Sequence, residues 1–319
     1  DMTNKRVLVT GASGFIGRSV VPYLAARGFE VRAAARDPDC LTAGKGVVPV
    51  KLPNLSRGLV DWSDLVEGCD YAVHLAGVAH ADKDIPETHY QAVNCGAVGS
   101  LGVAAGKAGL KRVVYISSVR AQSGPVADSV LTEDSPPQPS DAYGRAKLAG
   151  EMALCDALAG SAADWVTLRP VLVYGPEVKG NMAQLLKLAS LGLPLPLSTL
   201  GGRRSILSVE NLASAILHCI SADNAQRKVL LVADESPLKI ADIVAAMRRG
   251  LGRRPGLFGL PSAALAAAAK LAGKGEAWAR LDGDLMVATG ALRETGWQPA
   301  IGSREALAEM ARLTRLIPR

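Results

Sequence analysis

The stretch KRVLVTGASGFIGRSVVPYLAARG, residues 5–28, indicates the fold more clearly than any other part of the chain. A short apolar run leads into Gly11, Gly14 and Gly17, and an amphipathic helical pattern follows. In a nucleotide-binding βαβ unit, such glycines permit a tight turn, let the backbone approach a pyrophosphate, and let helix and strand pack closely. The spacing is GxxGxxG instead of GxGxxG, and a glycine-rich turn without a ligand is the alternative.

Short apolar runs alternate with helical patterns through the first half of the chain. Strands are predicted at residues 6–10, 30–35, 71–77, 112–118 and 165–170. Helices are predicted at 14–27, 86–108, 142–159, 180–191, 209–222, 239–250, 261–272 and 303–315. This order is typical of an α/β protein with a doubly wound parallel Rossmann sheet. We expect a Rossmann domain at 1–175 and a smaller, mostly helical substrate lobe at 176–319, with about 204–234 returning to the first domain.

Composition and net charge indicate which kind of molecule the protein binds. The 319 residues are 49% hydrophobic and 4% aromatic, and the formal net charge is +6. Basic residues are spread along the chain and few aromatic residues are present to stack on bases, so we expect an anionic small molecule and no nucleic acid. Five cysteines stand far apart without a CxxC pair: Cys40, Cys69, Cys95, Cys155 and Cys219. Scattered thiols of this kind favour a reduced protein in the cytoplasm.

The most apolar late stretch is LFGLPSAALAAAAKLAG, residues 257–273. It is too short to span a bilayer, and Pro261 and Lys270 interrupt it, so no integral membrane segment is expected. We predict a buried helix here, and contact with a membrane surface is the alternative.

A tyrosine and a lysine lie four residues apart in SPPQPSDAYGRAKLAGE, residues 135–151. The pair SD at 140–141 is typical of a helix cap, which places Tyr143 and Lys147 on one face of the first turns. A phenol with an ordinary pKa near 10 is a poor base, and a nearby ammonium favours the phenolate. A packed tyrosine and a solvated lysine are the alternative.

Several motifs in order resemble the extended branch of the short-chain dehydrogenase/reductase superfamily. TGASGFIG (10–17) is similar to its cofactor loop, HLAG (74–77) to its fourth-strand motif, and RPVLVYGP (169–176) to the motif after its sixth strand. The chain is thereby identified as a member of the NAD-dependent epimerase/dehydratase family, in its nucleotide-sugar 4-epimerase and 4-ketoreductase branch. The resemblance implies an NAD(P) cofactor, no metal, and a homodimer formed through helices such as 86–108 and 142–159.

The resemblance also implies roles for individual residues. Tyr143 exchanges a proton with the substrate oxygen, Ser118 orients that oxygen, and Lys147 bonds the nicotinamide ribose and tunes the phenol. The implied cofactor-binding residues are Gly11, Ser13, Gly14, Phe15, Ile16, Gly17, Arg36, Asn54, Leu55, Leu75, Ala76, Gly77, Asn94, Ser117, Tyr143, Lys147 and Pro170. Asn94 would hold the hydrogen-bond network of the site, and a solvent-facing Asn94 is the alternative.

Substrate contacts are implied in both halves of the chain. Asn181 and Arg204 correspond to positions that contact the nucleotide diphosphate in this branch, and the planar guanidinium suits phosphate oxygens. Two departures from the family pattern stand out: SSVRAQSG lacks the usual VYG, and Ala288 replaces an Asp. The full set of expected substrate-binding residues is His80, Arg120, Gln122, Arg169, Asn181, Arg204 and Arg280.

Arg36 bears on the choice of cofactor and of reaction. It ends EVRAAAR, residues 30–36, where many dinucleotide-binding proteins place an acidic residue on the ribose. A guanidinium suits the 2′-phosphate of NADP, and a surface arginine with NAD is the alternative. A reductase consumes reduced cofactor, so we expect a nucleotide-sugar 4-ketoreductase using NADP. A UDP-sugar 4-epimerase with tightly bound NAD and a reductase of a non-sugar ketone are the alternatives.

Overall fold

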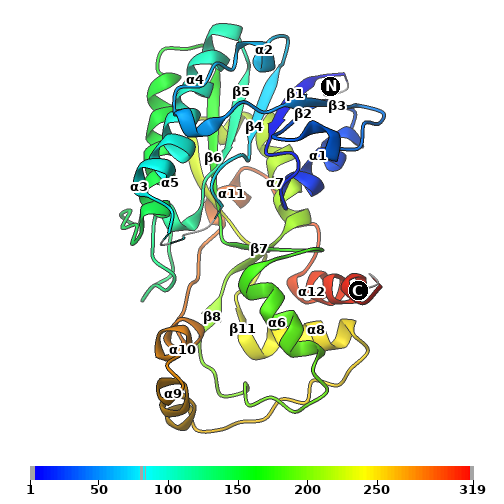
Figure 1. The fold of residues 1–319 in the computed structure, drawn as a ribbon, viewed down its shortest axis with the longest axis vertical. Coiled ribbons are helices and arrows are strands. Elements are labelled where there is room, and N and C mark those ends of the chain that lie inside the picture. The colour runs from blue at the N-terminus through cyan, green and yellow to red at the C-terminus, as the bar shows by residue number, and fades with distance from the viewer. Residues whose placement is uncertain (1–3, 80–81, 83, 317–319) are drawn as a thin grey trace.

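A seven-stranded parallel sheet forms one half of the protein (Figure 1). The computed structural model describes residues 4–79, 82 and 84–316. The strand order is β10–β6–β5–β4–β1–β2–β3. The strands are β1 (Arg6–Thr10), β2 (Glu30–Ala35), β3 (Val47–Lys51), β4 (Tyr71–His74), β5 (Arg112–Ile116), β6 (Asp164–Pro170) and β10 (Lys228–Val232). The order reverses between β1 and β4, so ligands are expected outside the carboxyl ends of these two strands.

Helices cover both faces of this sheet, which gives each face its own apolar core. On one face lie α1 (Gly17–Ala25) and α7 (Val209–Ser221), and on the other lie α4 (Ala97–Ala108) and α5 (Ala142–Ala157) (Figure 1). Because both faces are covered, β4 and β5 are buried along their whole length. The predicted doubly wound α/β sheet is confirmed.

The predicted helix at 86–108 is interrupted. It consists of α3 (Glu87–Gln91), the π turn η3 (Ala92–Gly96) and α4. In a π turn the hydrogen bonds span five residues instead of four, here from the amide of Ala97 to the carbonyl of Ala92, and such turns occur frequently at functional sites. Shorter elements of the first half are α2 (Ser63–Val66) and the 3-10 turns η1 (Pro38–Cys40), η2 (Leu55–Arg57) and η4 (Val119–Ala121).

The other half of the molecule is a smaller lobe with its own core. That core lies among α6 (Gly180–Ser190), α8 (Ile240–Gly250) and α12 (Ser303–Leu316). There are two small sheets: β7 (Leu172–Tyr174) with β9 (Ile206–Ser208), and β8 (Arg203–Arg204) with β11 (Leu238–Lys239), the second of which lies in the smaller lobe (Figure 1). The remaining elements are the 3-10 turn η5 (Asp223–Ala225), α9 (Ser262–Leu271), α10 (Gly275–Asp282) and α11 (Gly290–Glu294). After β9 the chain returns to the large sheet, where α7 packs and β10 pairs with β6.

The helix predicted at 261–272 exists as α9, but the expectation that it is buried is wrong. None of its residues is buried, because α6, α8 and α12 already fill the core of the lobe and α9 rests on α10 instead. Within the described part of the chain, every helix is too short or too polar to cross a membrane.

Candidate active site

The glycine loop forms a tight cradle between β1 and α1. Gly11 has φ +69°, and a Cβ added there would lie 2.8 Å from the amide nitrogen of Ala76. A Cβ added at Gly17 would lie 2.2 Å from the carbonyl oxygen of Gly11, so only glycine fits at this close approach. No side chain caps the start of α1 at Ile16, and the amide of Arg18 donates back to the carbonyl of Gly14 at 3.0 Å, so the loop passes directly into the first turn of the helix. The loop therefore fits the pyrophosphate of a dinucleotide.

Other predicted residues of this loop lie around the cradle. Gly14 is exposed, and its amide donates to Gly11 O at 3.0 Å. The carbonyl of Ser13 accepts from Arg18 Nε at 3.0 Å. A Cβ added at Gly175 would lie 3.6 Å from Phe15, which shows how closely this loop approaches the segment after β7.

Thr10 and His74 connect the loop to the end of β4. The hydroxyl of Thr10 accepts hydrogen bonds from the amides of Leu75 and Ala76 at 3.2 and 3.1 Å. Its own proton is therefore directed to Nδ1 of His74, 2.8 Å away, which leaves the imidazole proton on Nε2. Burial lowers the pKa of His74 to about 3, so the ring is neutral. Sequence reasoning missed this pair, although both residues lie in recognised motifs.

Ser118 and Tyr143 come together at the carboxyl end of β5. Ser118 follows that strand, and Tyr143 lies in the first turn of α5, where Asp141 Oδ1 accepts from the amide of Gly144 at 2.7 Å. Burial raises the pKa of the Tyr143 phenol, and a hydrogen bond with the Ser118 side chain opposes that rise. Ser118 Oγ also accepts from the amide of Arg120 at 3.1 Å. Ser118 therefore caps the 3-10 turn η4, which follows β5.

Lys147 lies one helical turn after Tyr143 and is 5% exposed. Its ammonium donates to the carbonyl of Ile116 at 3.0 Å and lies 5.1 Å from the centroid of the Tyr115 ring. Burial lowers the pKa of Lys147 to about 8, and the carboxylate of Glu151 opposes this shift. The solvated-lysine alternative is wrong. The tuning of the Tyr143 phenol by this ammonium stays a prediction, because burial and Ser118 are the main influences on that phenol.

Asn94 lies in the π turn and joins it to the segment after β4. Its Oδ1 accepts from the amide of Val78 at 2.9 Å, and its Nδ2 donates to the carbonyl of Val78 at 3.2 Å. A Cβ added at Gly77 would lie 2.7 Å from that Oδ1 and 3.6 Å from Lys147 Nζ. At 1% exposure, Asn94 does not face solvent. Three of the expected cofactor residues, Gly77, Asn94 and Lys147, therefore meet at one point.

Arg36 lies at the opposite end of the expected cofactor position. It is exposed after β2, and its carbonyl accepts a hydrogen bond from Lys51 Nζ at the end of β3. Asn54 caps η2 by accepting from the amide of Ser56 at 3.0 Å, and Leu55 is buried. Sequence reasoning missed Lys51 because the strand that carries it, VVPVK, was not predicted.

A buried ionic network lies next to Ser117 and α5. Arg169 donates to both oxygens of Glu151, at 2.9 and 2.6 Å, and to Gln122 Oε1 at 3.1 Å. Ser117 also donates to Glu151. Because Arg169 and Gln122 are 5% and 1% exposed, the structure places these two expected substrate residues inside the protein, in contact with protein partners. Glu151 was missed, although its spacing of four from Lys147 puts both on the same face of α5.

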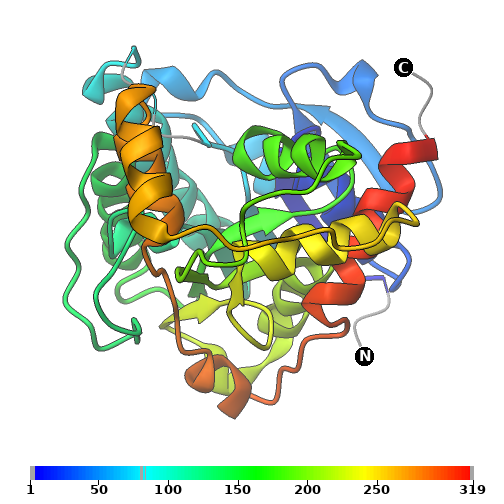
Figure 2. The same cartoon turned by 90° about the horizontal axis from the view of Figure 1, so that it is seen from below.

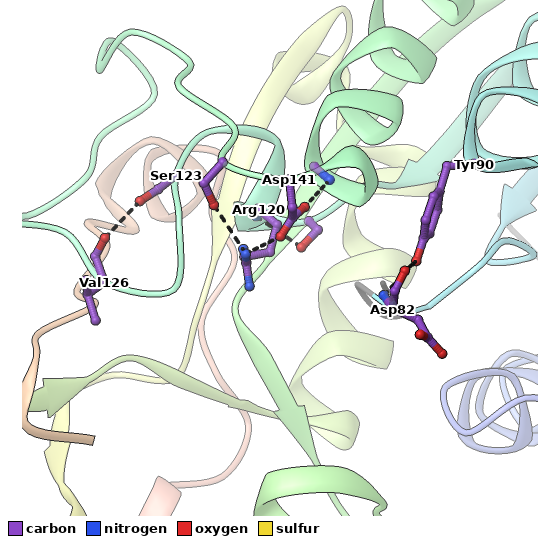
Figure 3. Close-up of polar contacts among 9 residues, drawn as sticks. Asp82, Tyr90, Arg120, Ser123, Val126 and Asp141 are labelled. Carbon is purple, nitrogen blue, oxygen red and sulfur yellow. Dashed lines mark hydrogen bonds and ion pairs between the residues drawn. The ribbon is translucent and has the colours of Figure 1, made fainter. Parts of the chain in front are cut away.

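Arg120 and Asp141 form an ion pair (Figure 3). The backbone of Arg120 is bonded to Ser118 Oγ. In the described chain, Nε of Arg120 has no hydrogen-bond partner. Figure 3 also shows Tyr90, on the side of this ion pair that is away from Ser123. The Tyr90 hydroxyl accepts a hydrogen bond from the amide of Asp82 at 2.7 Å. The Tyr90 ring packs edge-on against Tyr143, with ring centroids 6.3 Å apart. Tyr90 therefore packs against one side of the Tyr143 ring.

Four of the remaining expected residues are scattered through the second half. Pro170 is buried at the end of β6, and Asn181 is exposed in the first turn of α6. Arg204 on β8 donates to the carbonyl of Pro125 at 3.2 Å, and burial lowers its pKa. Arg280 is exposed on α10. His80 lies outside the described residues. The structure therefore groups Ser118, Tyr143 and Lys147 with the glycine cradle, and it does not group all of the expected substrate residues.

Comparisons with known proteins agree with this geometry. A model of the NAD dependent epimerase/dehydratase family matches residues 7–233. A UDP-glucose 4-epimerase from Vibrio cholerae is 31% identical over 318 residues, which cover 96% of this chain and 94% of that protein. The solved structure of MoeE5 in complex with UDP-glucuronic acid and NAD has a TM-score of 0.75 and 26% identity, and the match covers 97% of this chain and 99% of the other. A human epimerase family protein, SDR39U1, solved with NADPH, has a TM-score of 0.68 and 26% identity, covering 96% and 99%.

The family model covers well over half of the chain, and the Vibrio relative matches nearly all of it. The sequence resemblance rested on three motifs, which the structure places in the glycine cradle, at the end of β4, and at the end of β6 with β7. The chain belongs to the NAD dependent epimerase/dehydratase family and is an enzyme of the extended short-chain dehydrogenase/reductase type.

Proposed function

We propose that this enzyme is a nucleotide-sugar 4-epimerase that acts on a UDP-hexose with NAD as its cofactor. The observation that carries the proposal is the contact between Ser118 and Tyr143, one helical turn from Lys147, at the edge of the sheet where the glycine cradle lies. That arrangement suits reversible proton transfer at a carbinol oxygen. The nearly full-length likeness to a UDP-glucose 4-epimerase favours epimerisation over net reduction.

The residues that would hold the cofactor follow the groups described above. The glycine loop of Gly11, Gly14 and Gly17, at the N-terminus of α1, would bind the pyrophosphate. Lys147, beside Gly77 and Asn94, would bind at the nicotinamide ribose. When bound, the nicotinamide supplies the reversible redox chemistry at the sugar carbon.

The protein's own part in the reaction is proton transfer. Ser118 would hydrogen-bond the 4-oxygen of the sugar, and Tyr143 Oη would take the proton of that oxygen and later return it. Burial holds the pKa of the phenol above its ordinary value, so Tyr143 is protonated at neutral pH in the protein alone. A positive charge brought near it would favour the phenolate. We therefore infer that the phenol becomes an effective base when the site is filled.

A 4-ketoreductase using NADPH is the second candidate. Arg36 favours it, because its exposed guanidinium at the end of β2 suits a 2′-phosphate, and Lys51 lies beside its backbone. The structure of the NADPH-bound human family member is consistent with this reading. Arg36→Asp should weaken NADPH by roughly tenfold or more and NADH by much less, since a charge-assisted hydrogen bond to phosphate is lost. Titration of both cofactors by protein fluorescence measures this, and an equal loss for both would remove the case for NADP.

One experiment separates the two reactions. The purified protein is denatured and the released nucleotide identified by mass spectrometry, and the native protein is then given UDP-galactose with catalytic NAD. The epimerase proposal expects bound NAD and formation of UDP-glucose without net change in NADH absorbance. Stoichiometric oxidation of NADPH with a UDP-4-keto-hexose, and no interconversion of UDP-hexoses, would establish the reductase instead. Tyr143→Phe serves as the inactive control.

We also propose that two copies pair through α4 and α5. An open depression of about 460 Å³ lies on this face, and its lining includes Leu59, Val103 and Ala153. Leu59 and Val103 are 86% and 44% exposed, which is unusual for large apolar side chains on adjacent surface. Val103→Glu should shift the protein to a monomer in sedimentation velocity. An unchanged sedimentation coefficient would place the contact elsewhere.

A further inference from the structure

The connection from α8 through α10 exposes apolar and basic side chains on one surface. Phe258 and Leu260 are 43% and 39% exposed, and Leu271 at the end of α9 is 91% exposed. Arg253 and Arg254 lie just before these residues and Lys270 lies beside Leu271, and all three are exposed. Large apolar side chains gathered on a protein surface commonly mark a contact with a partner.

A second segment adds to the same surface. The amide of Leu195 donates to Gly256 O at 3.0 Å, and the amide of Phe258 donates to Leu195 O at 3.0 Å, so residues 191–198 run beside 254–260. This places Leu191 and Leu193, which are 45% and 66% exposed, next to the basic residues. We call the whole set the lobe-end surface: Leu191, Leu193, Arg253, Arg254, Phe258, Leu260, Lys270, Leu271 and Lys274.

An open pocket of about 280 Å³ lies within the lobe-end surface, lined in part by Leu193, Arg253 and Arg254. Beneath it, Arg248 is buried and donates to five backbone carbonyls, among them Leu191 O at 3.1 Å and Leu193 O at 2.7 Å. Arg248 therefore fixes the backbone that carries the apolar side chains. The two outer arginines are the ones that face solvent.

The charge of the protein is concentrated in this region. Residues 248–280 contain seven Lys or Arg residues and one acidic residue, Glu276. The formal charge of this segment, +6, equals that of the whole chain, so the rest of the sequence is neutral overall. A basic surface that also projects leucine and phenylalanine side chains is complementary to an anionic lipid interface.

The lobe-end surface lies at the end of the molecule remote from the seven-stranded sheet (Figure 1). Figure 2 looks onto that end, where α9 and the connection from α8 lie toward the viewer. Since the glycine cradle belongs to β1 and α1 at the other end, a flat contact here leaves the cofactor position uncovered.

We propose that the lobe-end surface docks the enzyme on an anionic lipid bilayer. The apolar side chains insert at the level of the headgroups while Arg253, Arg254, Lys270 and Lys274 contact lipid phosphates. A second copy of this chain fits less well, because pairing two faces of the same high charge is repulsive. A nucleic acid would match the charge, but it offers no apolar layer for Leu193, Phe258 and Leu271.

The test is co-sedimentation of the full chain with vesicles of phosphatidylcholine, with and without phosphatidylglycerol. Binding is expected only to the anionic vesicles and should fall as salt is raised. Arg253→Gln with Arg254→Gln should lower the partition coefficient roughly 25-fold, at about fivefold for each charge near the surface. The matched control, Lys45→Gln with Lys228→Gln, removes two exposed charges from the sheet end and should leave binding nearly unchanged.

A second arm tests the apolar part. Phe258→Ser with Leu271→Ser should lower vesicle binding by roughly tenfold or more, because two partly inserted side chains are lost. Epimerase activity without vesicles should stay unchanged in all of these variants, which also shows that they are folded. The proposal fails if the wild type ignores anionic vesicles at low salt, or if the control pair lowers binding as much as the arginine pair. It also fails if Phe258→Ser with Leu271→Ser dissociates a dimer, or if this pair raises KM without changing vesicle binding.

Discussion

The buried ammonium of Lys147 should cost the cofactor-free protein stability that a methionine would recover. Lys147 is 5% exposed, and burial lowers its pKa from 10.5 to about 8. At about 1.4 kcal/mol per pH unit, keeping this group charged inside the folded protein costs about 3 kcal/mol at neutral pH. Methionine has a similar length and no charge. It gives up the hydrogen bond to Ile116, which contributes about 1 kcal/mol. Lys147→Met should therefore raise the free energy of unfolding by about 2 kcal/mol at pH 7.

The stability of the wild type should depend on pH because the pKa of Lys147 differs between the folded and unfolded protein. The unfolded lysine keeps its proton up to its ordinary pKa of 10.5, whereas the folded one releases it near pH 8. The folded wild type therefore gains stability relative to the unfolded chain as pH rises from about 8 toward 10.5, and it loses that gain as pH falls again. Lys147→Met lacks this component, so the two stabilities should converge and then cross in alkaline solution.

Urea unfolding of the cofactor-free proteins at several values between pH 7 and pH 10, at one protein concentration, measures both quantities. Lys45→Met is the control, because Lys45 is exposed and its loss should leave the pH dependence unchanged. If Lys147→Met is less stable than the wild type at pH 7 and has the same pH slope, then the ammonium is better compensated than its burial indicates. Activity is lost in either case and does not decide the question.

Three further predictions concern other buried groups. Tyr143→Phe should lower kcat by roughly 10²- to 10⁴-fold and leave the Kd for the cofactor nearly unchanged, since only the proton-transfer group is removed; surviving turnover would remove Tyr143 from the mechanism. Because the folded pKa of His74 is about 3, the free energy of unfolding should fall by about 1.4 kcal/mol per pH unit below pH 6.5, and His74→Gln should lack this acid dependence in urea titrations. Glu151→Gln should cost about 3 to 5 kcal/mol by leaving Arg169 unpaired, and Glu151→Leu with Arg169→Met should recover most of it; equal losses in the single and double variants would contradict a buried ion pair.

The central sheet and helix α5 could be predicted because they depend on local sequence signals. Strands buried on both faces produce the apolar runs of β1, β4 and β5, and glycines with fixed spacing mark the turn into α1. Asp141 at a helix cap is also a short-range signal, and it set the position of Tyr143 and Lys147 correctly on α5.

The buried polar contacts around the site could not be predicted from local sequence signals, because they join segments that are distant in the sequence. Arg169 meets Glu151 across 18 residues and Gln122 across 47, and no local pattern distinguishes such an arginine from one that faces a substrate. β3 was missed because its run is short, contains Pro49 and is only partly buried at the sheet edge. The burial of α9 was predicted wrongly because an alanine-rich apolar helix has the same sequence pattern whether or not a core is left for it to join.

The π turn at Ala92–Gly96 makes this region sensitive to chain length. One residue corresponds to about 100° of rotation and 1.5 Å of rise in an α-helix. Deleting a single residue from the π turn would allow a regular helix from α3 into α4, and that change would rotate α3 about its axis relative to α5. Tyr90 would then leave the edge of Tyr143, and Asn94 would leave Val78. Homologous enzymes that share this site should therefore vary in sequence through this turn more readily than in the number of residues it contains.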